Sequence, residues 1–139
     1  MQVKNFLGIL ALLMSPLSGL SHHSVAANFD PSVTTEVEGI ITGIFWRNPH
    51  VVFTLTPPGE NSGTEWNLET HSLSIMKRMD VSKPFVQVGD QIKAAGWPAR
   101  RGQGLFVNNM LLPTGEEFVF SFGSEPAELR WSDQLWGTN

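Results

Sequence analysis

The chain has 139 residues, no cysteine and a formal net charge of −4 at pH 7. This acidic balance argues against a nucleic-acid-binding domain, which needs an excess of cations to pair with phosphates. The lack of cysteine excludes disulfides, a lipid-anchored cysteine and thiolate zinc sites, so the folded protein depends on its hydrophobic core.

The first residues have the pattern of a secretory signal. Residues 1–5 carry Lys4, and an apolar run follows over residues 6–13. This run is far shorter than the roughly 18 to 20 apolar residues of a membrane-spanning helix, so we expect no membrane span after cleavage. Residues 19–21, Gly-Leu-Ser, supply the small side chains that signal peptidase requires. Cleavage there leaves His22 as the new N-terminus.

Two later positions, after Ala26 and after Ala27, also satisfy the cleavage rule and would remove both His22 and His23. We prefer the first site because it lies nearest to the apolar run. Removing 21 residues leaves about 118, with eight basic and thirteen acidic side chains and a net charge of −5, which suits one small domain. The product is expected to be soluble, and periplasmic or secreted in bacteria. The expected organisation is a signal peptide over residues 1–21, a single domain over 22–120 and a C-terminal tail over 121–139.

The segment after the leader is predicted to form three strands. "TEVEGIITGIFW", residues 35–46, is rich in β-branched and aromatic residues around Gly39 and Gly43, which favours a long strand bent or bulged at the glycines. "HVVFTLTP", residues 50–57, alternates between apolar and polar faces, and "EWNLET", residues 65–70, follows a turn-rich segment. The side chains expected to face the core are Val51, Phe53, Leu55, Trp66, Leu68 and Ile92.

The next segment changes its hydrophobic period. "SLSIMKRM", residues 72–79, places Leu73 and Met76 on one stripe, which is typical of a short helix, with Thr70 or Ser72 as the N-cap. Two strands are then predicted in "QIKAAGWPA" and "LFVNNMLLP", separated by the turn "RRGQG". "EEFVFSF" is expected to add at most a short extra strand.

Three strands, a helix and two strands, with a long coiled first strand, are typical of a five-stranded OB-like Greek-key barrel. We therefore expect a mainly β fold with one short helix between strands 3 and 4. A β-sandwich is the alternative, but it gives no reason for a helix at this place. In OB barrels the ligand face consists of strands 2 and 3 with the loops joining strands 1 to 2 and 4 to 5, which here are residues 47–49 and 99–104.

Four segments carry a family resemblance: "HHSVAANFD", "VEGIITGIFWRNPH", "VGDQIKAAGWPARRGQG" and "LPTGEEF". They resemble a family of small exported bacterial domains, the domain-of-unknown-function family 6152. The resemblance covers residues 22 to about 120, and its most specific parts are the His-His-Ser start and the Trp-x-Asn-Pro-His run at residues 46–50. It implies an exported domain with no established activity. The tail over 121–139 and His71 depart from the family pattern.

The histidines suggest a metal site. If cleavage follows Ser21, His22 offers its α-amine and its ring Nδ1 to one ion, a chelate that suits copper, while His23 and His50 are candidates for a further imidazole. The Phe-Asp-Pro segment at 29–31 is expected to pin the N-terminal stretch to the barrel wall. No spacing typical of zinc is present, and no other cofactor is expected. The alternative is a frayed terminus, with His50 holding a strand corner by hydrogen bonding.

A second candidate is a stacking surface with cationic edges for a sugar, a nucleotide or an anionic small molecule. The alternative is that the large aromatic side chains fill the core or cover the barrel ends and that the arginines belong to a solvated loop. The candidate residues are Trp46, Arg47, Asn48, Trp66, Trp97, Arg100 and Arg101.

Catalysis has little support in the sequence. No nucleophile elbow, cysteine nucleophile or phosphate-binding glycine loop is present. Glu36 and Glu38 share one face of the first strand, and Glu65 and Glu69 lie along the third, so residue type alone leaves a paired-carboxylate glycosidase open. The alternative is that these exposed carboxylates only increase solubility.

We therefore expect an exported, non-enzymatic binding or accessory domain whose ligand is a small molecule or a protein of the cell envelope. Nucleic acid is not an expected partner. The alternative function is a copper-binding protein, or an oxidative copper-dependent enzyme, that uses His22 together with His50.

Overall fold

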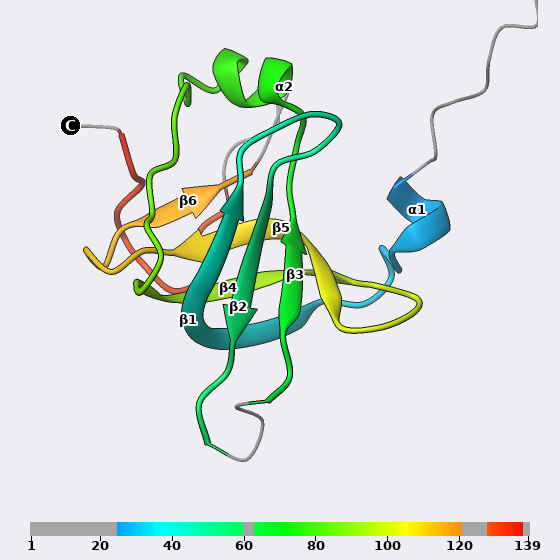
Figure 1. Cartoon of the computed structure of the whole chain (residues 1–139). Helices are drawn as coiled ribbons and strands as arrows, with labels where there is room; N and C mark the ends of the chain where they lie inside the picture. The colour runs from blue at the N-terminus through cyan, green and yellow to red at the C-terminus, as the bar shows by residue number, and fades with distance from the viewer. Residues whose placement is uncertain (1–24, 60–62, 121–127, 138–139) are drawn as a thin grey trace, which may run out of the picture.

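The structure is a computed structural model that describes residues 25–59, 63–120 and 128–137 (Figure 1). The described residues form strands and short helices, consistent with the predicted mainly β composition. Their bounds in chain order are α1 (Val25–Asn28), β1 (Thr35–Phe45), β2 (Val52–Thr56), β3 (Trp66–Glu69), α2 (Leu73–Arg78), β4 (Gln91–Pro98), β5 (Gly104–Leu111) and β6 (Glu117–Val119).

The sheet closes into a five-stranded barrel. Neighbouring strands follow the order β3-β2-β1-β4-β5-β6, and β3 also pairs in parallel with β5, which closes the ring. All other strand pairs are antiparallel, so the barrel is mixed. The predicted OB-like barrel with a helix between strands 3 and 4 is therefore confirmed. The short β6 extends the sheet beyond the ring from β5.

Strand β1 pairs with two strands, β4 and β2, and its glycines allow the bend and the close strand approach that this pairing needs. Its first half pairs with β4, its second half pairs with β2, and a bulge lies between Ile41 and Gly43. A Cβ atom on Gly39 would lie 2.4 Å from the carbonyl oxygen of Thr56, so only glycine allows this close approach of the two strands. The predicted bend of a long first strand at its glycines is confirmed.

The core is formed by the residues that alternate inward along the strands. Val51, Phe53, Leu55 and Leu68 are fully buried and Ile92 is nearly so, as predicted. Trp66 is different, because its larger ring is only partly buried against the edge of the core.

Helix α2 covers one end of the barrel (Figure 1). Its Met76 is fully buried in the core, which confirms the predicted apolar stripe. Ser72 is the N-cap by position, but its side chain makes no capping hydrogen bond. Instead, the backbone N–H of Leu73, in the first turn, donates a hydrogen bond to the carboxamide oxygen of Asn48 at 3.2 Å. Asn48 therefore joins the β1–β2 loop to the helix.

The described part of the C-terminal tail packs on the barrel. The carboxylate of Glu117 is fully buried and accepts the backbone N–H groups of Arg130, Trp131 and Ser132 and the side-chain amide of Asn109. A run of backbone donors around one carboxylate is a strong anion-binding arrangement. The tail segment over 128–136 is thus an integral part of the fold.

A second anchor of this segment is electrostatic. Arg130 Nε donates to a Glu36 carboxylate oxygen at 2.6 Å, and Lys93 Nζ lies 3.0 Å from the other oxygen. These side-chain hydrogen bonds, first from Arg130 and then from Lys93, lower the pKa of Glu36 from its ordinary value of 4.5. A lowered folded-state pKa stabilises the folded protein above the unfolded pKa, and this contribution is lost as the pH falls through the folded-state value.

Glu36→Gln is therefore expected to lower the urea midpoint of unfolding at about pH 7, and to lower it less at a pH acid enough to protonate the carboxyl in the folded parent, below its lowered pKa. Glu38→Gln is the matched control, because the Glu38 carboxylate accepts a hydrogen bond from the neutral Gln91 side chain rather than from two cations. An equal effect of Glu36→Gln at both pH values would contradict the electrostatic anchor.

Candidate functional site

Two adjoining hollows form one concave face on the outside of the barrel. One has a volume of about 390 Å³ and the other of about 730 Å³, and both are lined by Val52, Asn67 and Glu69. The smaller hollow also reaches the β1–β2 loop, and the larger one reaches the β4–β5 loop and the N-terminal segment. We call this combined surface the β2–β3 groove. The loop segments 47–49 and 99–104 expected at a ligand face both contribute to it.

The alternation of the strands explains which side chains line the groove. In β2, Phe53 and Leu55 point into the core, so Val52 points outward. In β3, Leu68 points into the core, so Asn67 and Glu69 point outward on either side of it. Because successive side chains on a strand face opposite sides, the inward position of the core residues fixes which of their neighbours face the groove.

The smaller hollow lies at the β1–β2 loop. Phe45, Arg47, Asn48, Pro49 and His50 line it with the shared strand residues. The Phe45 ring is 44% exposed, and the Arg47 guanidinium lies over this ring at 5.5 Å from its centroid. An exposed aromatic ring beside a cation is therefore present at this end of the groove.

His50 is held by an acidic partner at the centre of the groove. Its Nδ1 atom contacts a carboxylate oxygen of Glu69, which lines both hollows. The side chains of His50 and Glu69 are 36% and 28% exposed. This contact orients the imidazole and leaves Nε2 as its second nitrogen for another partner.

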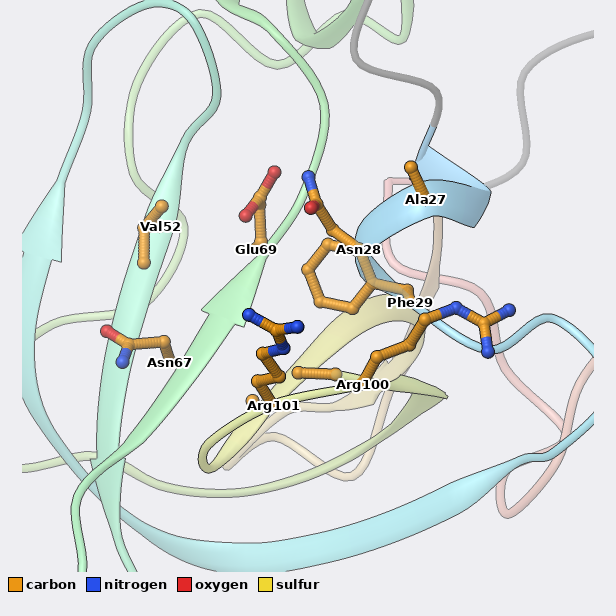
Figure 2. Close-up of a pocket in the computed structure, with 10 residues that line it drawn as sticks. Ala27, Asn28, Phe29, Val52, Asn67, Glu69, Arg100 and Arg101 are labelled. Carbon is orange, nitrogen blue, oxygen red and sulfur yellow. The ribbon is translucent and has the colours of Figure 1, made fainter.

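The larger hollow lies at the β4–β5 loop (Figure 2). Arg100 donates from Nε to the carbonyl oxygen of Ala26 at 3.1 Å, and its Nη1 lies 3.6 Å from the Asp30 carboxylate. Arg101 points into the hollow in Figure 2, and among the described residues its side chain has no ion pair. Arg100 therefore belongs to the scaffold, whereas Arg101 remains available to a ligand.

The N-terminal segment completes the wall of the larger hollow. The Phe29 ring is buried and packs against Phe106, with 5.7 Å between the ring centroids. The backbone joins β4 and the following loop, because Asp30 N–H donates to Pro98 and Arg100 N–H donates to Asn28. The prediction that Phe29 pins this segment to the barrel is confirmed. Pro31 remains exposed, and His22 and His23 lie outside the described residues.

The three tryptophans proposed as a stacking surface lie in separate places and are not among the groove-lining residues. Trp46 packs edge-on against Phe53 with centroids 6.4 Å apart, Trp66 packs against the core, and Trp97 stacks on Phe106 at 5.8 Å. The phenylalanine rings that line the groove are those of Phe45 and Phe29. Neither ring is predicted from the sequence to line the ligand face.

The remaining candidate groups have partners within the fold. Glu36 and Glu38 lie on one face of β1 as expected, bonded to Arg130 and Gln91 respectively, and Glu65 accepts a hydrogen bond from the Thr42 hydroxyl at 3.1 Å. Among the described residues no group of three or more histidine, aspartate or glutamate side chains is placed to hold a metal ion.

His71 lies between two segments of the fold. Its Nε2 lies 3.0 Å from the carbonyl oxygen of Phe120, and its ring packs edge-on against Phe106. The residue therefore joins the end of β3 to the segment after β6.

The model of a protein family, described as a family of unknown function (DUF6152), matches residues 11–107. The matched range includes both groove loops, β2 and β3, and it ends within β5, before the tail segment. No curated protein matches the sequence. In the described part of the chain, none of the helices has the length and apolar character needed to cross a membrane.

Proposed function

The chain belongs to DUF6152, a family of unknown function, and we propose that it is an exported, non-enzymatic binding domain that holds its ligand in the β2–β3 groove. The observation that carries the proposal is the position of the groove. Two hollows meet over β2 and β3 and extend to the β1–β2 and β4–β5 loops, which is the surface that OB barrels use for ligands.

The composition of the groove also supports binding. Ligand sites in proteins usually measure about 300 to 1,000 Å³ and carry a few placed polar groups, and both hollows lie in this range. Arg47 and Arg101 place positive charge at the two loops, although the chain as a whole is acidic. This local reversal of charge favours a ligand with negative groups.

The groove can be blocked by one substitution. Asn67→Trp would place a large ring on an exposed position shared by both hollows. We expect native mass spectrometry to show a retained small molecule on the parent after incubation with an envelope extract of the producing cell, and none on the variant. Ile40→Trp, on an exposed position of β1 outside the groove, is the matched control and should retain it. Equal retention by both variants would place the ligand elsewhere.

Export is tested by the mature N-terminus. Cleavage after residue 21 predicts that intact-mass analysis of the exported protein begins at His22. Cell fractionation should place this form outside the cytoplasm. An uncleaved chain recovered only from the cytoplasm would contradict export, and a start at Ala27 or Asn28 would remove both N-terminal histidines.

A second candidate function is copper binding by His22 and His50. The observations that favour it are the docking of α1 beside the groove and the contact of Glu69 with His50 Nδ1. A carboxylate on one imidazole nitrogen orients the other toward a metal and makes it a better ligand. His22 precedes Val25, the first residue of α1, by three residues. It is therefore close along the chain to the wall of the groove.

Copper binding is tested on mature protein with a native His22 terminus. The alternative predicts a type-2 electron paramagnetic resonance signal with Cu(II), and at least about a ten-fold weaker affinity, about 1.4 kcal/mol, in His50→Ala. One extra residue before His22 should have an equally severe effect because it displaces the α-amine. His71→Ala is the histidine control. If both altered proteins bind copper as the parent does, the binding does not use this site.

A further inference from the structure

We propose that the ligand of the β2–β3 groove is an acidic oligosaccharide, such as a chain of uronic acid units, whose carboxylates pair with Arg47 and Arg101. This inference rests on the proposed binding function and names its ligand class. Three observations support it: the positive charges at the β1–β2 and β4–β5 loops, the polar side chains between these loops, and the pairing of β2 and β3 beneath the groove.

The two arginines are free to bind carboxylates. Arg47 and Arg101 are exposed, and within the described residues neither forms an ion pair, in contrast to Arg100. A guanidinium binds a carboxylate through two parallel hydrogen bonds. Because Arg47 lines one hollow and Arg101 the other, a ligand that reaches both carries acidic groups on separate units along its length.

The groups between the arginines suit sugar hydroxyls. Asn28, Asn67 and Glu69 lie round the larger hollow in Figure 2, and Asn67 and Glu69 line the smaller one as well. Carboxamides both donate and accept hydrogen bonds, and a carboxylate accepts them, so these side chains match a row of hydroxyl groups. The exposed part of the Phe45 ring, which has the Arg47 guanidinium over it, adds apolar surface for the C–H groups of a pyranose beside the arginine.

The strand pairing argues against an extended peptide. β2 pairs with β1 and β3, and β3 pairs with β2 and β5, so both strands under the groove have partners on each side. A peptide therefore has no free strand edge for β-augmentation at this surface. It would lose the backbone hydrogen bonds that give such complexes their affinity.

The side chains also argue against single-stranded nucleic acid. Phe45 is an exposed ring on the groove, but Phe29 is buried against Phe106 and Trp46, Trp66 and Trp97 lie elsewhere. Nucleic-acid faces of this kind stack successive bases on several rings and follow the phosphates with many cations. Within the described residues the groove is lined by two arginines without an ion pair, Arg47 and Arg101, which is few for a backbone with a phosphate on every nucleotide.

The test is isothermal titration calorimetry of the full mature protein with tetragalacturonate. Its methyl ester is the matched neutral probe, because it keeps the length and the hydroxyls and removes the charges. We expect the acid to bind at least about ten-fold more tightly than the ester, and Arg47→Gln and Arg101→Gln each to weaken acid binding by about five-fold or more. Lys83→Gln, an exposed cation outside the groove, should leave it unchanged.

Circular dichroism of each variant verifies that it is folded. Equal binding of acid and ester, or unchanged binding in both arginine variants, would overturn the proposed charge pairing. Hexaglutamate and oligothymidylate are titrated in parallel. Suppose that one of these two probes binds, that Asn67→Trp abolishes its binding, and that tetragalacturonate does not bind. The proposed ligand class is then wrong, but the groove is still a binding site. If none of the probes binds and native mass spectrometry finds no groove-dependent ligand, the proposed function fails as well.

Discussion

Phe53→Ala is expected to lower the free energy of unfolding by about 3 to 5 kcal/mol, as deletion of a fully buried phenylalanine ring usually does. Phe53 has no exposed surface, and its ring packs against those of Trp46 and Phe85. The substitution would leave a cavity in the core beneath β2. Denaturant unfolding monitored by tryptophan fluorescence measures the loss.

The matched control for Phe53→Ala is Val33→Ala, because Val33 is 46% exposed and precedes the barrel strands. It should change the free energy of unfolding by no more than about 0.5 kcal/mol. A loss below about 1 kcal/mol for Phe53→Ala would show that the ring does not fill the core and that the inward phase of β2 is wrong.

The second large effect is expected at Glu117. Glu117→Gln keeps the size of the side chain but turns one carboxylate oxygen into an N–H donor that faces other N–H donors. Since hydrogen bonds to a charged group are worth about 1.5 to 3 kcal/mol each and the tail can relax in part, we expect a loss of about 2 to 4 kcal/mol. Hydrogen exchange should accelerate at residues 130–132, whose amides the carboxylate binds.

Glu116→Gln is the matched control for this second prediction. Its carboxylate accepts a hydrogen bond from the Thr114 hydroxyl and, in the described part of the tail, from none of the amides that bind Glu117. It should leave both stability and amide exchange at residues 130–132 close to the parent. If Glu117→Gln behaves in the same way, the buried carboxylate does not anchor the tail.

The barrel was predictable because local sequence patterns determine its strands. Alternation along β2 and β3 identified the buried faces, and glycines inside a β-branched run indicated the coiled β1. Once the order of strands and helix was known, the general geometry of OB barrels gave the two groove loops. These predictions depend on neighbours in sequence, so one chain was sufficient for them.

The aromatic side chains of the groove were not predictable in the same way. The bulge between Ile41 and Gly43 shifts the alternation of β1, so that Phe45 is exposed and Trp46 packs on the core. Without the bulge, the odd-numbered positions that are buried earlier in the strand would continue inward and include Phe45. A composition rich in glycine indicates a bulge but does not give the residue at which the phase changes.

Contacts between segments that are distant in sequence could also not be predicted from local sequence patterns. Glu117 and the tail amides, and Arg100 with Asp30, meet because the chain folds back on the barrel. Nothing near Glu117 in the sequence distinguishes it from its neighbour Glu116, which is only partly buried. From the sequence the tail was therefore predicted to lie outside the domain, although its described part packs on the barrel.

The central claim, that the β2–β3 groove is the binding surface, is tested most directly by amide chemical shifts of ¹⁵N-labelled mature protein titrated with tetragalacturonate. We expect saturable shifts that cluster at Val52, Asn67, Glu69 and Arg101, with the Ile40 amide unmoved. No shifts at millimolar ligand would overturn the proposed ligand class, and saturable shifts centred on another surface, such as that around Glu36, would contradict the central claim itself.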